Sequence, residues 1–242
     1  SLYVVDVRQS LHFQQVFAVA RVAGLASADI SLEHIAYGTM MGKDGKPFQT
    51  RAGDTIKLVE LLNGACRRAF ELVSGKNPDL DEDSRQAIAD KVGIGAVKYA
   101  DLSKNRTSDY IFDWSSMLSF EGNTAPYLMY AYARIKSILR KQEVALERYN
   151  ITSIDAQEER DLLLKNLQLP EVIEMVAADC YPNLLCNYLY ELAGKFMRFY
   201  EACPILKVEL ERRNSRLSLA ALTAETLQQG LDLLGIETLE QM

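Results

Sequence analysis

The first group of residues that could do chemistry lies in the glycine- and lysine-rich stretch 41–55, MGKDGKPFQTRAGDT. Lys43, Lys46 and Arg51 supply positive charge there, and glycines such as Gly45 let the backbone approach a ligand closely. Positive charge on a pliable loop suits an anionic group such as a polyphosphate. The pattern therefore indicates a loop that handles a nucleotide.

Aromatic residues form the second group, in the stretch 120–134, FEGNTAPYLMYAYAR. Tyr127 and Tyr130 are three residues apart and Arg134 follows four residues later, so the three share one face of a helix. Flat rings and a guanidinium plane suit unstacked nucleobases. Tyr132 points to a different face, and we expect it in the core.

Both groups also have ordinary structural explanations. A loop of glycine, lysine and aspartate is often a solvated turn, and Pro47 after Lys46 breaks the G-x-x-x-x-G-K-[ST] phosphate-loop pattern. The polar run 104–106 fits contacts with RNA phosphates and a solvated turn equally well. Tyrosines on a helix are often core residues. We expect core packing for three aromatic residues further along: Tyr188, Tyr190 and Phe199.

Composition narrows the class of protein. The 242 residues are 48% hydrophobic, enough for a sizeable core, and carry a net charge of −6. This charge argues against nonspecific binding of nucleic acid, including DNA, but leaves room for a local RNA-binding surface. No apolar run approaches the ~20 residues of a membrane span. We therefore expect no membrane association.

The cysteines disfavour both disulfide and metal chemistry. They form no C-x-x-C pair, and only His12 and His34 could join them, so we expect no metal site. Unpaired thiols suit a reducing compartment, and we expect a cytoplasmic protein. The four cysteines are Cys66, Cys180, Cys186 and Cys203.

The first part of the chain has the rhythm of an α/β layer. We expect strands over 2–7 and 34–40, separated by a helix that Ser10 caps and Gly24 ends. A second helix is expected to start with Asp54 as its cap. Because two strands do not make a sheet, we expect further strands upstream of residue 1.

The remainder reads as helix. Gly93 and Gly95 mark either a break or a point of close packing within 80–102. Thr124 with Pro126 starts a long helix to about residue 149. The absence of a strand pattern after Trp114 predicts an α-helical bundle. Further helices are expected near 155–168, 170–180, 183–203 and 216–234.

The chain resembles the C-terminal part of the arginyl-tRNA synthetases of bacteria, which are class I synthetases. The matching segments occur in the same order and run almost from end to end. They are YVVDVRQSLHFQQVF at 3–17, MGKDGKPFQTRAGD at 41–54, VGIGAVKYADLSKNRTSDYIFDW at 92–114 and FEGNTAPYLMYAYARIKSI at 120–138, followed by a leucine-rich end.

This resemblance implies roles for the loop. In the family, the segment MGKDGKPFQTR stands where other class I enzymes carry K-M-S-K, a loop that closes over ATP. Its cations stabilise charge on the leaving pyrophosphate. Lys46 is the first candidate, with Lys43 and Arg51 as helpers and Gly45 among the ATP-binding residues. The wording departs from K-M-S-K, so the individual roles stay open.

The resemblance also implies substrate contacts after the first strand. Gln9 and His12 match the family's Q-x-x-H-F element, which places Gln9 at the arginine substrate and His12 near the adenosine. The class I H-I-G-H signature is absent from the sequence, and the stretch 34–37, which reads H-I-A-Y, does not replace it. We therefore expect this chain alone not to aminoacylate.

On the anticodon side, the resemblance matches Tyr127, Tyr130 and Arg134 to the family's base-stacking face. Tyr200 and Met242 match later contributions to it. The implied fold is mostly α: residues 1–115 form the end of a Rossmann-type α/β catalytic domain, and residues 116–242 form an all-α anticodon-binding bundle.

The function implied is ligation of arginine to its tRNA through an arginyl-adenylate, with ATP and Mg²⁺. The expected partners are arginine, ATP and arginine tRNA. The alternative is a free-standing helical tRNA-binding or regulatory protein that shares the bundle. A purely structural helical adaptor would explain the leucines but neither the loop nor the tyrosine face.

Overall fold

The structure is a computed structural model that describes residues 1–47, 57–141 and 150–241. It forms two compact units. The strand unit comprises Ser1–Ile56 and Lys104–Asp113, and the helical unit comprises Lys57–Ser103 and Trp114–Met242. Division of the chain at residues 115/116 stays a prediction. No helix in the described ranges combines the length and apolar character of a membrane span.

The strand unit begins with a β–α–β arrangement. Strand β1 (Leu2–Asp6) pairs in parallel with β2 (Glu33–Tyr37), so that Val4 lies opposite Ile35. The 3₁₀ turn η1 (Val7–Gln9) and helix α1 (Ser10–Val22) connect them. The predicted strand–helix–strand order is confirmed, whereas Ser10 as cap is wrong. Gln9 holds the N-cap position, and the Ser10 hydroxyl donates to the Val7 carbonyl at 2.6 Å.

The strand predicted over 34–40 is divided into two. After β2 come Gly38 and β3 (Met40–Met41), and β3 pairs in parallel with β4 (Tyr110–Ile111), a strand that the sequence did not predict. A Cβ at Gly38 would lie 2.6 Å from the Ser108 carbonyl oxygen. The incoming segment 104–113 therefore needs glycine at this position. The predicted cap Asp54 lies outside the described residues.

The strand unit buries little apolar surface. Ile35 and Phe112 are its buried hydrophobic residues within the described ranges. Every residue of α1 is at least partly exposed, and Val22 retains 91% of its accessible surface. The aromatic side chains of Tyr3 and Phe13 hold α1 against β1, with ring centroids 5.4 Å apart.

The helical unit starts with a tight hairpin of α2 (Leu58–Lys76) and α3 (Glu82–Leu102). A Cβ at Gly93 would lie 2.6 Å from the Cys66 backbone nitrogen, and one at Gly95 would lie 2.5 Å from the Met129 methyl carbon. Of the two explanations for these glycines, close packing is confirmed. The helix break is wrong, because α3 is continuous.

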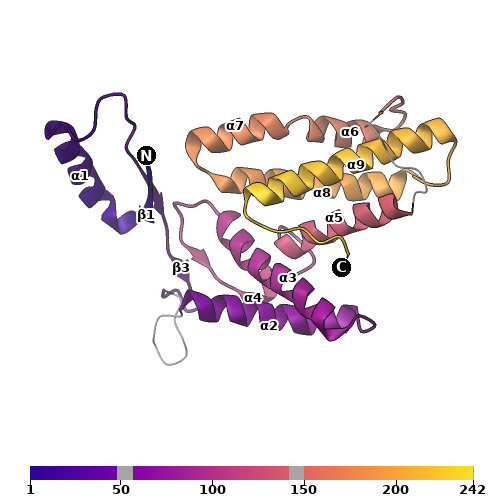
Figure 1. Cartoon of the computed structure of the whole chain (residues 1–242), viewed down its shortest axis with the longest axis horizontal. Helices are drawn as coiled ribbons and strands as arrows, with labels where there is room; N and C mark the ends of the chain where they lie inside the picture. The colour runs from indigo at the N-terminus through magenta and orange to yellow at the C-terminus, as the bar shows by residue number, and fades with distance from the viewer. Residues whose placement is uncertain (48–56, 142–149, 242) are drawn as a thin grey trace. The chain divides into compact units, whose positions relative to one another are not determined.

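In the described part of the chain, five further helices follow the short helix α4 (Trp114–Met117). Thr124 caps α5 as predicted, with its hydroxyl oxygen accepting from the Tyr127 N–H at 3.3 Å. The end predicted near residue 149 is wrong, because α5 ends at Arg140 with Lys141 as its C-cap; residues 142–149 lie outside the described ranges. Figure 1 shows α6 and α7 in orange and α9 in yellow alongside α8. The bounds are α5 Ala125–Arg140, α6 Gln157–Asn166, α7 Leu169–Asp179, α8 Pro182–Ala202 and α9 Leu210–Leu233.

A buried ion pair fixes the start of α6 to α9. The Glu159 carboxylate accepts from Arg216 Nε and from the backbone N–H groups of Asp155 and Ala156. The two charged side chains retain 3% and 8% of their accessible surface. Burial tends to raise the pKa of Glu159, but these hydrogen bonds and the guanidinium together hold it below its ordinary value.

The hydroxyl of Tyr99 ties α3 to the bundle. It donates towards Asn123 Oδ1 at 2.5 Å and the Cys186 carbonyl at 2.9 Å. Burial raises the pKa of Tyr99, so the hydroxyl stays protonated. Ile236, in the segment after α9, packs near Gly95 on the same helix. The α2–α3 hairpin therefore packs with the bundle in one unit.

Candidate nucleotide loop and nucleic-acid interface

The loop of the strand unit is a closed turn. The backbone N–H of Gly42 donates to the Lys46 carbonyl at 2.7 Å, and Met41 pairs with Pro47 in an antiparallel bridge. Gly45 has a φ of +71°, in the left-handed region that glycine adopts without strain. The sequence thus forms a small projecting turn that presents both lysines.

The two described cations of this turn differ in their partners. Lys43 forms an ion pair with Asp113. Lys46 is exposed and, within the described ranges, has no carboxylate partner for its ammonium group. Lys46 is therefore the cation more readily offered to an anionic ligand. Arg51, the third predicted cation, lies outside the described residues.

Gln9 and His12 are both exposed at the carboxyl end of β1. Gln9 occupies the N-cap position of α1, and the His12 ring lies edge-on to Phe13 with centroids 5.6 Å apart. Ligands of open α/β sheets bind at this end of the strands. The position of Gln9 and His12 is therefore compatible with substrate binding, but it does not identify which ligand atoms they would contact.

Asn105 and Arg106, in the polar run 104–106, are used inside the strand unit. Asn105 Oδ1 accepts from the Thr107 N–H at 3.1 Å, and Arg106 Nη1 donates to the Ala36 carbonyl at 2.7 Å. The Arg106 bond holds β2 against the segment 104–113, and the Asn105 bond lies within that segment. Lys104 is exposed. These bonds favour a structural role over phosphate contacts for Asn105 and Arg106.

On α5, Tyr127, Tyr130 and Arg134 are half-buried along one face, as their spacing predicts. Arg134 Nη1 donates to the Tyr130 hydroxyl at 2.8 Å. The opposite side of the helix is buried, with Leu128 and Met129 fully covered. The packed side of α5 therefore holds these rings in a fixed position on its other side.

Tyr200 joins this face from α8. The Arg134 guanidinium carbon lies 4.7 Å from the Tyr200 ring centroid, within range of a cation–π contact. Tyr200 also stacks on Phe196 at 6.2 Å. The structure thus brings together four of the five predicted anticodon residues, while Met242 lies outside the described residues.

Three of the four aromatic residues assigned to the core are confirmed there. Tyr132, Tyr188 and Phe199 retain 1%, 2% and 0% of their accessible surface. The assignment of Tyr190 is wrong: it retains 37% and lies edge-to-face with Tyr127 at 5.6 Å. Residues two apart on a helix point in different directions, so Tyr188 and Tyr190 cannot both face the core.

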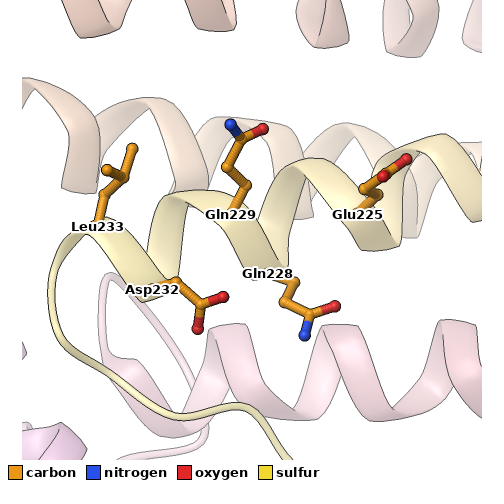
Figure 2. A pocket seen from close by; sticks show the side chains of 5 residues that line it. All are labelled: Glu225, Gln228, Gln229, Asp232 and Leu233. Carbon is orange, nitrogen blue, oxygen red and sulfur yellow. The ribbon is translucent and has the colours of Figure 1, made fainter.

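A separate pocket on α9 has the wrong chemistry for RNA. Figure 2 shows its lining side chains, which include the carboxylates of Glu225 and Asp232 and the amide of Gln228. Carboxylates repel phosphates, and no cation lines this pocket within the described residues. Another pocket lies between α2 and α3 and is lined in part by Cys66. Burial raises the pKa of the Cys66 thiol.

Comparison with known proteins covers both halves of the chain. The family "tRNA synthetases class I (R), catalytic domain" matches residues 1–114, and the "DALR anticodon binding domain" matches residues 128–242. Proteins named arginine–tRNA ligase from Laribacter hongkongensis and a Marinomonas species are each 58% identical over 244 aligned positions. The chain belongs to the class I arginyl-tRNA synthetase family.

Solved arginyl-tRNA synthetases share the fold. The Thermus thermophilus structure matches the whole chain with a TM-score of 0.87 and 33% identity, and the Plasmodium falciparum structure with 0.80 and 27%. The chain covers 41% of each of these structures and 42% of the two curated relatives. It therefore corresponds to the C-terminal portion of an arginyl-tRNA synthetase, and the predicted mostly-α fold is confirmed.

Proposed function

We propose that the chain supplies the tRNA-recognition bundle and the ATP loop of an arginine–tRNA ligase. The observation that carries this proposal is the cluster of half-buried rings and one guanidinium, Tyr127, Tyr130, Arg134 and Tyr200, within the match to an anticodon-binding domain. Each ring can stack on an unpaired base, and such a stack contributes ~1–3 kcal/mol. The proposed partner is arginine tRNA.

For the loop, we propose that Lys46 stabilises charge on the leaving pyrophosphate when the arginine carboxylate attacks ATP. Its ammonium group is exposed and forms no ion pair with any described carboxylate, which supports this role, and the ion pair with Asp113 makes Lys43 the weaker helper. Gly45 would let the turn approach the phosphates, and Arg51 is the further proposed cation. Such stabilisation acts mainly in the transition state.

Gln9 is the proposed contact to arginine, and His12 the proposed neighbour of the adenosine. Mg²⁺ has no evident protein ligands here: in the described ranges, no group of three or more His, Cys, Asp or Glu could hold a metal ion. No step is assigned to it. A cytoplasmic location stays a prediction.

A free-standing helical tRNA-binding or regulatory protein is not favoured, because the catalytic-domain family matches residues 1–114. The sequence has no H-x-G-H element. We therefore expect the 242-residue chain to bind arginine tRNA without activating arginine.

The test measures binding of the purified chain to an arginine tRNA transcript and to the same transcript with a swapped anticodon. Tighter binding to the first supports the proposal. Equal binding to both would overturn anticodon recognition. Arginine-dependent exchange of pyrophosphate into ATP, measured in parallel, would contradict the expected inactivity.

A further inference from the structure

One glycine of the helical unit has no structural explanation. Glycine inside a helix costs stability relative to alanine, so its presence usually has a packing or functional reason. The reason is packing at Gly64, Gly93, Gly95 and Gly230, where an added Cβ would press on Trp114, Cys66, Met129 and Leu189. Gly194 differs, because a Cβ there would meet nothing within 4 Å.

Gly194 lies well inside α8, where the helical cost applies in full. Gly75 also has open space around its Cβ, but it belongs to the last turn of α2, where helices fray and glycine costs less. No described atom of the protein therefore fills the space where a side chain at Gly194 would lie.

The neighbours of Gly194 are chemically suited to a nucleobase. Tyr190 and Arg198 lie four residues to either side of it and share its helix face. Tyr190 is 37% exposed and meets Tyr127 edge-to-face at 5.6 Å. One ring of this pair belongs to α5 and the other to α8, so the two helices frame the glycine-floored surface together.

Polar groups lie on the same face. Arg198 is exposed and, among the described residues, forms no ion pair with a carboxylate. Asn187 accepts a hydrogen bond from the Asn123 amide at 3.1 Å and is itself exposed. Arg198 and Glu201 act in opposite directions on the pKa of Tyr127, and the Asp161 carboxylate also lies near Arg198. This mixture suits a base edge better than a row of phosphates.

We propose that Tyr190, Gly194 and Arg198 extend the aromatic face as a second base-binding site, which receives an unstacked nucleobase of the tRNA anticodon loop. The base lies on the tyrosine pair, and the missing side chain at Gly194 allows it to approach the backbone of α8. Arg198 donates to the base or to its phosphate. The proposal of this site rests on the proposed tRNA-binding function. Its three residues are not among those to which the resemblance gives a role.

Gly194→Ala is the deciding variant, since it separates binding from folding. Alanine gains helix propensity in open space, so the melting temperature should rise by about 2–4 °C. A methyl group in the path of a closely held base should weaken binding of arginine tRNA by about tenfold. Gly75→Ala is the matched control and should leave binding unchanged.

Tyr190→Ala tests the ring in the same assay and should weaken binding by about 5- to 150-fold. If the wild-type chain fails to bind arginine tRNA, the proposed function fails and the site with it. If it binds, and Gly194→Ala binds equally well, the site alone is overturned. A fall in melting temperature of Gly194→Ala would show a structural reason for the glycine and also overturn the site.

A second copy of the chain is the competing occupant of this surface. Sedimentation velocity without RNA separates the two, because a self-association surface predicts that Tyr190→Ala changes the oligomeric state. An unchanged sedimentation profile together with weaker tRNA binding supports the base-binding site. A changed profile would overturn it.

Discussion

The loop of the strand unit and the aromatic face of the helical unit present their functional side chains in opposite ways. Lys46 projects from a turn closed by backbone bonds, in a unit that buries few apolar side chains. Tyr130 and Arg134 project from a helix whose opposite side is fully packed. A mobile charge tolerates a pliable support, whereas a base stack needs rings held in a defined plane.

The largest expected effect is on the stability of the helical unit. Glu159→Gln should destabilise it by ~3–5 kcal/mol, because it leaves the buried Arg216 guanidinium without its counter-charge. Chemical denaturation followed by circular dichroism measures the loss. Glu174→Gln, at an exposed position on α7, is the control and should change little.

Hydrogen exchange on the same variant tests the comparison itself. We expect protection to fall in α6 and α9 while β1 and β2 keep their wild-type rates. Equal loss in both units would mean that they unfold as one body, and the contrast drawn above would not hold.

The next effect concerns the loop. In a full-length ligase, Lys46→Ala should lower kcat for arginine activation, because the leaving-group charge develops in the transition state. The expected loss corresponds to an activation free energy higher by ~2–4 kcal/mol. Lys43→Ala should cost less, because Asp113 already shares its charge. Pyrophosphate exchange kinetics measure both. A raised KM at constant kcat would assign Lys46 to ground-state ATP binding.

A smaller effect is expected on the aromatic face. Tyr130→Ala should weaken cognate tRNA binding by ~1–3 kcal/mol, the contribution of one base stack, with a smaller penalty for a swapped anticodon. Tyr132→Ala, on the buried side of α5, should lower stability without altering discrimination. If Tyr130→Ala lowers stability and leaves discrimination intact, Tyr130 is a packing residue.

The smallest effect is the acid dependence of the buried pair. The pKa of Glu159 is lower in the folded chain than its unfolded value of ~4.3. Its contribution is therefore fully present above that value and is lost as the pH falls through the folded pKa. As the pH falls below the unfolded value, wild type should lose more stability than Glu159→Gln. Parallel curves would contradict the lowered pKa.

Local signals in the sequence predicted most elements of the helical unit. Thr124 and Pro126 mark the start of α5 because capping and proline geometry act within one turn. The spacing of Tyr127, Tyr130 and Arg134 placed them on one face for the same reason. These features depend on neighbours in the chain and can be deduced without the fold.

Features set by distant partners could not be deduced in this way. Glu159 and Arg216 are 57 residues apart, and the division of the second strand depends on Ser108 reaching Gly38. The role proposed for Gly194 rests on the open space around it, which only the structure shows. Tyr190 was the exception, since its spacing from Tyr188 already excluded one of the two from the core.

The Tyr99 hydroxyl has a mechanical consequence. It joins α3, which lies within the catalytic-domain match, to the N-terminal part of α8, which belongs to the anticodon-binding match. The carbonyl that it holds is four residues before Tyr190 on the helix that carries Tyr200. The position of the start of α8 is therefore coupled to that of α3 through a single side-chain hydroxyl, which Tyr99→Phe would remove.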